Sequence, residues 1–135
     1  MSSESELVVP IRADVDVLVA RRRARDLVSG LRFSGTELTL IATAISEVAR
    51  NIVSYAGTGE IVLRVVEKER RRGLAVIARD RGPGIADIER AMQDGYSTSR
   101  SLGLGLPGSK RLMDEFEIAS ELGKGTVITM TKWER

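Results

Sequence analysis

Apolar residues recur every three or four positions in two stretches of the first half of the chain, which is the spacing of an amphipathic helix. The first stretch predicts a helix that begins near Asp14 or Asp16, either of which can cap it, and that runs to about Leu31. The second helix begins at a capping-box pattern, Ser34 with Glu37 three residues later, and should end near residue 55. Its apolar stripe consists of Leu38, Ile41, Ile45, Val48 and Ile52.

Shorter apolar runs predict strands. They cover residues 7–11, 60–66, 73–79, 116–120 and 126–133. Pro10 places the first run at a sheet edge, because proline cannot donate a ladder hydrogen bond. The charged residues 67–72 predict a turn, with the arginines 70–72 as a solubilising hairpin tip. Two further helices are expected, over residues 85–92 and from residue 104 or 105 to residue 115, with a mobile loop over residues 93–102 between them.

The predicted order is β-α-α-β-β-α-α-β-β. Strands joined at hairpin distance, with the helices in separate blocks, are typical of an α+β two-layer sandwich. We therefore expect one domain over residues 1–135, with a mixed, mostly antiparallel sheet and its helices on one face.

Composition and charge exclude several function classes. The chain is 42% hydrophobic and 30% charged, ordinary values for a soluble protein, and its net charge of +2 is too small to indicate nucleic-acid binding. It has neither cysteine nor histidine, which excludes disulfides, the usual zinc sites, a Ser-His-Asp triad and phospho-histidine chemistry within this chain. No apolar run is long enough for a membrane span, and the first six residues are polar and acidic, so we expect a cytoplasmic protein.

One carboxylate and a set of glycines suggest a nucleotide site. Asp80 closes the predicted strand 73–79 and is followed by Gly82 and Gly84, and a second glycine-rich run covers residues 103–108 before a predicted helix. Glycines permit close backbone approaches, and a helix N-terminus offers unpaired N–H groups to an anion. A carboxylate for a donor-rich ligand edge and a glycine loop for phosphates together suit a nucleotide.

Glu47 and Asn51 lie four residues apart on the second predicted helix, which places them on one face, roughly 6 Å apart along the axis. An amide oxygen suits Mg²⁺, which keeps waters and phosphates as further ligands. A carboxylate one turn away can accept a proton from an attacking hydroxyl. Taken alone, the pair is also compatible with an ordinary exposed polar pair.

The glycine run at residues 103–108 matches the dinucleotide-binding pattern by letter, but the polar residues before it do not predict the strand that this pattern requires. A protein-kinase glycine loop is also excluded, because no Val-Ala-Ile-Lys or His-Arg-Asp follows. In isolation the run predicts only a tight loop before a helix.

In combination these motifs resemble those of the GHKL ATPase superfamily, which includes gyrase and the histidine-kinase catalytic domain. The resemblance covers nearly the whole chain. Three segments narrow the resemblance to one group within the superfamily, and they are residues 45–51 (ISEVARN), 94–99 (DGYSTS) and 108–116 (GSKRLMDEF). They are similar to the small serine/threonine protein kinases of bacterial partner switching, in particular the stressosome switch kinases.

The resemblance implies the Bergerat fold of GHKL ATPases, with ATP and Mg²⁺ as cofactors. Asn51 would hold the Mg²⁺ between the phosphates, and Glu47 would be the general base toward a Ser or Thr hydroxyl. Asp80 would accept a hydrogen bond from the adenine amino group, while Gly82 and Gly84 would let the base and ribose approach.

Further contacts follow from the same resemblance. A lid over the phosphates would run from residue 97 to residue 102 and would include Ser97, Thr98 and Ser99. Backbone N–H groups for the phosphates would come from Gly103, Leu104, Gly105 and Leu106. The adenine would rest over Thr126, through a water molecule.

Three functions share this fold and these residues. The first is a kinase that phosphorylates a serine or threonine of a STAS-domain protein, with a downstream phosphatase as a possible further partner. The second is an anti-sigma factor that sequesters a sigma subunit in an ATP-dependent manner, and the third is an ATP-binding adaptor without transfer, against which the retention of Glu47 argues. We expect neither nucleic acid nor a membrane as a partner.

One basic cluster has no place in these functions. Its members lie mostly off the apolar stripe of the first predicted helix and are Arg21, Arg22, Arg23 and Arg25. A solvated helix face is the simpler interpretation, and a basic partner-binding face is the other.

Overall fold

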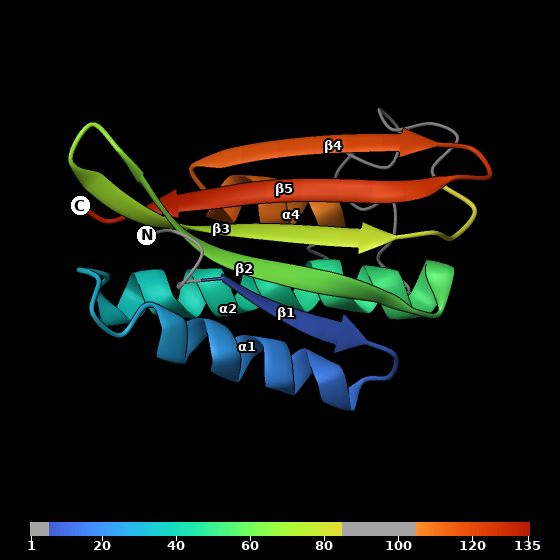
Figure 1. The fold of residues 1–135 in the computed structure, drawn as a ribbon, viewed down its shortest axis with the longest axis horizontal. Helices are drawn as coiled ribbons and strands as arrows, with labels where there is room; N and C mark the ends of the chain where they lie inside the picture. Colours follow the sequence, from blue (N-terminus) through green and yellow to red (C-terminus); the bar gives the residue numbers. More distant parts are fainter. Residues whose placement is uncertain (1–5, 85–104) are drawn as a thin grey trace.

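The structure is a computed structural model and describes residues 6–84 and 105–135. Its strands are β1 (Glu6–Ile11), β2 (Gly59–Lys68), β3 (Arg71–Asp80), β4 (Glu115–Glu121) and β5 (Gly125–Trp133). Its helices are α1 (Val15–Leu27), α2 (Gly35–Asn51), the π-helical turn η2 (Ile52–Ala56) and α4 (Gly105–Leu112). The strands form one sheet in the order β1-β2-β3-β5-β4, and the helices lie on one face of it (Figure 1).

This arrangement confirms the predicted two-layer α+β fold, and every described strand pair is antiparallel. The predicted helix 85–92 and the loop 93–102 lie outside the described residues. No described helix has the length and apolar character needed to cross a membrane.

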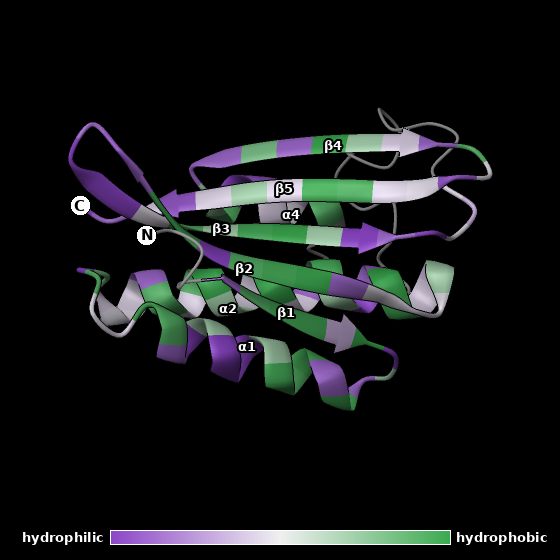
Figure 2. Ribbon diagram, viewed as in Figure 1, coloured by the Kyte–Doolittle hydropathy of each residue, from purple (hydrophilic) through white to green (hydrophobic). Residues whose placement is uncertain are grey.

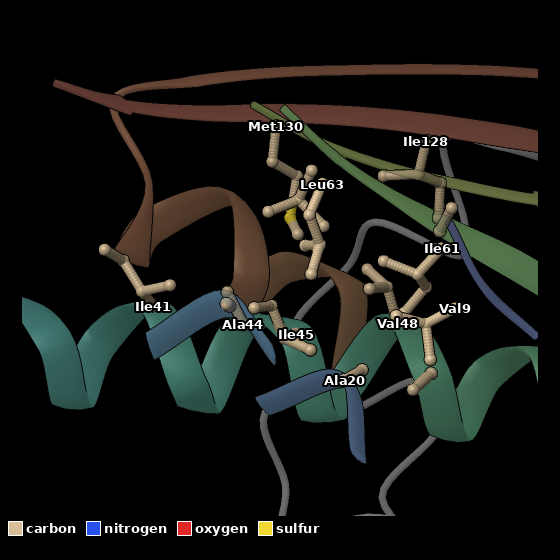
Figure 3. Close-up of a cluster of buried hydrophobic side chains, with 14 of the residues drawn as sticks. Val9, Ala20, Ile41, Ala44, Ile45, Val48, Ile61, Leu63, Ile128 and Met130 are labelled. Carbon is tan, nitrogen blue, oxygen red and sulfur yellow. The ribbon is translucent and has the colours of Figure 1, made fainter. Parts of the chain in front are cut away.

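The core lies between α2 and the centre of the sheet. In the predicted stripe, Ile41, Ile45, Val48 and Ile52 are buried and Leu38 is half-buried. Figure 3 shows side chains of α2 facing the apolar side chains of β2 and β5. In that view the helix contributes Ile41, Ala44, Ile45 and Val48, and the sheet contributes Ile61, Leu63, Ile128 and Met130. Burial of the stripe fixes which face of α2 is left for polar side chains.

The capping box at the start of α2 is confirmed. The Glu37 amide donates to Ser34 Oγ at 3.0 Å, and the Ser34 amide donates to Glu37 Oε1 at 3.0 Å. The first helix differs from the prediction, because it ends at Leu27 rather than near Leu31. Asp14 occupies the predicted N-cap position, but its side chain makes no capping hydrogen bond. Asp16 Oδ2 accepts from the amides of the two residues at positions 12 and 13, which precede the helix.

The β2–β3 hairpin turns more tightly than predicted. Its two turn residues, Glu69 and Arg70, both have positive φ (53° and 69°), as in a type I′ turn built without glycine. Arg71 and Arg72 were expected at a solubilising tip, but both belong to β3. The Arg71 guanidinium lies 5.8 Å from the ring centroid of Trp133, and Arg72 Nε lies 3.7 Å from Glu134 Oε2.

The helix α4 ends at Leu112, three residues earlier than predicted. The chain then turns into β4, and the Asp114 amide already donates to the Thr131 carbonyl at 2.9 Å. The buried Lys132 places its ammonium group 2.9 Å from the Leu112 carbonyl oxygen. A cation at this position satisfies a helix C-terminal carbonyl and suits the negative end of the helix dipole.

Hydrogen bonds of the C-terminal residues join the α1–α2 connection to the sheet. The buried Glu134 accepts from the amides of Arg32 (2.9 Å) and Arg72 (3.3 Å), and its own amide donates to the Arg72 carbonyl. Arg135 continues the network, because its guanidinium contacts the carboxylates of Glu37 at 3.3 Å and Asp114 at 3.0 Å. Segments about a hundred residues apart in sequence are thereby joined.

Candidate functional site

Asp80 lies at the end of β3, in the middle of the sheet. The strand register sets it opposite Gly59 of β2 on one side and Thr126 of β5 on the other. Its Oδ1 accepts a hydrogen bond from the Gly82 amide at 2.9 Å, and within the described part of the chain its other carboxylate oxygen has no partner. A half-buried carboxylate with one oxygen available can therefore receive a hydrogen bond from a ligand.

The end of α2 approaches this strand end. A Cβ placed on Gly82 would lie 2.6 Å from the Ala56 Cβ, and one placed on Gly59 would lie 2.9 Å from Ile52 Cγ2. These crowded contacts show that the η2 turn packs directly against the Asp80 loop. The last turns of α2 and Asp80 therefore belong to the same end of the molecule (Figure 1).

Glu47 and Asn51 occupy these last turns of α2, as the sequence predicts. Glu47 is only 4% exposed, and its Oε2 lies 3.5 Å from the guanidinium of Arg50. Asn51 is half-buried and is the last residue of the α-helix before the backbone changes to π-helical hydrogen bonding, with the Gly57 amide donating to the Ile52 carbonyl. Such π turns are often found at functional sites.

Two further glycines close the backbone around Asp80. Gly84 and Gly125 have φ values of 80° and 103°, in the region that side chains disfavour. A Cβ on Gly125 would overlap the Asp80 carbonyl oxygen, and one on Gly84 would overlap the Glu121 carbonyl oxygen. The predicted Gly82 and Gly84 are thus needed for close packing of the loop against the protein itself.

Thr126 lies beside Asp80 on the helix-facing side of the sheet and is 5% exposed. Its Oγ1 is 2.9 Å from Ser120 Oγ, which also donates to the Gly125 carbonyl at 3.1 Å. This contact restrains the hydroxyl of Thr126, the residue that the strand register sets opposite Asp80. The sequence interpretation missed Ser120, although the β4–β5 hairpin spacing contains the signal, because it pairs Ser120 with Thr126.

The N-terminal end of α4 points toward the Asp80 end of the molecule. Its C-terminal residue leads into Glu115, which pairs with Thr131 near the opposite end of β5, and eight helical residues rise about 12 Å. The helix begins at Gly105, and Leu106 is buried against the core. The predicted phosphate contacts Gly103 and Leu104 and the lid residues Ser97, Thr98 and Ser99 lie outside the described residues.

The candidate site contains groups from four elements. They are the available carboxylate oxygen of Asp80, the hydroxyl of Thr126, the amide of Asn51 with the shielded carboxylate of Glu47, and the N-terminus of α4. A separate hollow of about 810 Å³ reaches Asp80 from the other face of the sheet, where Arg79 and Val127 line it. Glu47, Asn51 and Thr126 do not line that hollow, so the predicted site residues on α2 and β5 are separate from it.

Comparison with known proteins agrees with this geometry. The family model of the histidine kinase-like ATPase domain matches residues 10–132. The chain belongs to the histidine kinase-like ATPase family. This is the ATP-binding superfamily that the sequence motifs resemble.

Individual relatives place the chain more narrowly within this ATPase family. It is 49% identical over 127 residues to the serine/threonine-protein kinase RsbT of Bacillus subtilis (strain 168), which covers 94% of this chain and 96% of that protein. It is 36% identical over 103 residues to an anti-sigma F factor of Caldanaerobacter subterraneus subsp. tengcongensis, covering 72% of this chain and 71% of that protein. The protein is a member of the RsbT-type serine/threonine protein kinases, within a group that also contains anti-sigma factors.

Among solved structures, the RsbU and RsbW domains of Rv1364c from Mycobacterium tuberculosis share the fold. The TM-score is 0.63 at 21% identity, over 96% of this chain and 33% of that chain. This likeness supports the α+β architecture of the ATPase family.

Proposed function

We propose that this protein transfers the γ-phosphoryl group of ATP to a serine or threonine of a STAS-domain partner, in partner-switching control of a stress response. The observation that carries the proposal is the shielded Glu47 on the turn of α2 before Asn51, at the helix end that packs on the Asp80 loop. The 49% identity to a serine/threonine-protein kinase supports the same activity.

Each residue has a separate task. Asp80 accepts a hydrogen bond from the adenine amino group with its available oxygen, and Thr126, held by Ser120, supports the base beside it. Asn51 is the residue that would hold Mg²⁺, and its amide oxygen suits a hard cation. The bound Mg²⁺ would neutralise charge on the phosphates. Glu47 takes the proton from the partner's hydroxyl, and Arg50 beside it restricts the orientation of the carboxylate.

The test measures single-turnover transfer of labelled phosphate to candidate STAS proteins. Removing a general base slows transfer by roughly 10²–10⁴-fold, so Glu47→Gln should lose transfer while it still binds Mg-ATP and the partner. Asn51→Ala should weaken Mg-ATP binding and lose transfer as well. Glu67→Gln, at an exposed position on β2, is the matched control and should behave as wild type.

Two outcomes would contradict the proposal. Wild-type transfer by Glu47→Gln would remove the general base from this position. Capture of a sigma subunit in the presence of ATP, with no phosphate passed to any STAS protein, would favour the second candidate, an ATP-dependent anti-sigma factor. The observation that supports this second candidate is the 36% identity to an anti-sigma F factor.

A further inference from the structure

The outer surface of α1 carries a groove that the proposed kinase chemistry does not use. A cavity of about 310 Å³ lies between α1 and α2, with Leu18, Leu38 and Ile41 among its apolar lining residues. Leu18 at the groove is 55% exposed, and Val15, which lies three residues before it and outside the lining, is 63% exposed. Large apolar side chains left in water beside a groove are typical of a protein-binding surface.

Arginines form the rim of this groove. Arg21, Arg22 and Arg25 line it, and they follow Leu18 at intervals of three, four and seven residues, which places all four side chains on one face of α1. All three are exposed, and none forms an ion pair or hydrogen bond with the described part of the chain. Figure 2 shows the resulting mixture of hydrophilic and hydrophobic bands along α1.

We propose that the α1–α2 groove binds an acidic amphipathic helix of a partner protein. Two antiparallel helices leave a groove whose shape suits a third helix, and apolar side chains at i, i+3, i+4 and i+7 would fill the apolar floor. Asp or Glu residues flanking that stripe would pair with the three arginines. Charge complementarity of this kind sets the choice and orientation of a partner more than its affinity.

Other basic-surface ligands fit less well. A nucleic acid would bring phosphates against Leu18 and Val15, and neither α1 nor α2 supplies an aromatic residue on which a base can stack. A membrane surface would favour an apolar face with Trp or Phe, whereas the apolar floor here is recessed between two helices.

The groove is separate from the ATP site. Ile41 lies ten residues before Asn51 on the same helix, which corresponds to about 15 Å along the axis. A helix bound in the groove leaves the end of α2 accessible to nucleotide. The inference therefore does not depend on the proposed phosphoryl transfer, and ATP binding serves as an independent check of each variant.

The test uses the full chain and a labelled 20-residue helical peptide with leucines at i, i+3, i+4 and i+7, flanked by glutamates. Peptides with lysines in place of the glutamates, or with the same composition scrambled, are the controls. We expect the acidic peptide to bind in fluorescence anisotropy, and the double variant Arg22→Glu/Arg25→Glu to weaken that binding roughly tenfold or more. The lysine peptide should regain binding to this double variant.

Arg23→Glu is the matched control variant, because Arg23 is an exposed arginine of the same helix that does not line the groove. It should change peptide affinity by less than about threefold. Leu18→Asp should abolish binding, and thermal melting with ATP titration should show that each variant is folded.

Several results would overturn the proposal. These are no binding of the acidic peptide, equal binding of all three peptides, or an Arg23→Glu effect as large as that of the double variant. Binding of wild type to anionic vesicles or duplex DNA, lost in the double variant, without binding of the acidic peptide would assign the surface to a membrane or a nucleic acid instead.

Discussion

Glu134 and Asp80, at opposite ends of the sheet, use their carboxylates in opposite ways. At the Glu134 end, Glu134 is buried and accepts two backbone amides, while Asp114 and Glu37 pair with Arg135. At the Asp80 end, Asp80 accepts one amide, and its second oxygen has no partner in the described residues.

This difference indicates how the fold divides stability and function. Hydrogen bonds satisfied inside the chain contribute to folding, whereas an available acceptor in a half-buried site contributes nothing until a ligand supplies the donor. Substitutions at the Glu134 end should therefore change unfolding, and substitutions of polar side chains at the Asp80 end should change ligand binding. Variants at each end test this division of stability and ligand binding, beginning with the backbone that both folding and binding need.

The largest expected effect is structural and lies at the Asp80 end. In Gly125→Ala the new Cβ would overlap the Asp80 carbonyl oxygen at a φ of 103°, so we expect a loss of about 3 kcal/mol in the free energy of unfolding. Gly123→Ala is the control, because Gly123 also has positive φ (80°) but open space around it, and should cost only about 1 kcal/mol. Denaturant unfolding measures both, and equal losses would show that the close approach to Asp80 is unimportant.

The second effect is on ligand affinity. Asp80→Asn replaces a charged acceptor by an amide, and the lost charge-assisted hydrogen bond should weaken ATP binding by roughly 1.5–3 kcal/mol, or about 10–150-fold. Its thermal midpoint should remain close to that of wild type. Glu134→Gln should do the reverse, lowering the midpoint and leaving ATP affinity unchanged in calorimetry. If both variants lose ATP binding, the two ends are not separate.

Local patterns in the sequence predict many of the features at the two ends of the sheet. The stripe containing Ile45 and Val48 predicts the α2–sheet core, and Ser34 with Glu37 predicts the capping box, because these signals act within a few residues. The Asp80 loop is likewise predicted by its own glycines.

The unpredicted features depend on distant contacts or on unusual backbone. Glu134 reaches Arg72 across 62 residues, and no local pattern encodes that pair. The π-helical turn before Gly57 contains no breaker that would distinguish it from α-helix, and the turn at Glu69 and Arg70 lacks the glycine that normally marks positive φ. In each case tertiary packing decides the backbone conformation.

The third prediction concerns acid unfolding. The Arg32 amide lowers the pKa of Glu134, burial opposes it, and the Arg72 amide and guanidinium add to the lowering, so the pKa lies below its ordinary value of 4.5. Because the unfolded chain then binds more protons, the stabilisation is present above pH 4.5 and is lost as the pH falls through the folded pKa.

Glu134→Gln should therefore flatten the dependence of the unfolding midpoint on pH below 4.5. Glu121→Gln provides the control, because Glu121 is 71% exposed and, among the described residues, forms an ion pair with Lys124 alone, at 3.7 Å. The acid-range melting curves of this variant should follow wild type. An unchanged slope in Glu134→Gln would place the acid-sensitive group elsewhere.

The smallest effect is expected at the start of α2, at the Glu134 end. Ser34→Ala removes the acceptor for the Glu37 amide and should cost about 1 kcal/mol of unfolding free energy. Thr39→Ala is the control within the same helix, since its hydroxyl only donates to the Gly35 carbonyl and alanine has the higher helix propensity. That variant should be as stable as wild type or slightly more stable. Both should bind ATP as wild type does, because the cap lies seventeen residues, or about 25 Å along the helix, from Asn51. A change in ATP affinity in Ser34→Ala without one in Thr39→Ala would mean that the two ends of α2 communicate through the helix.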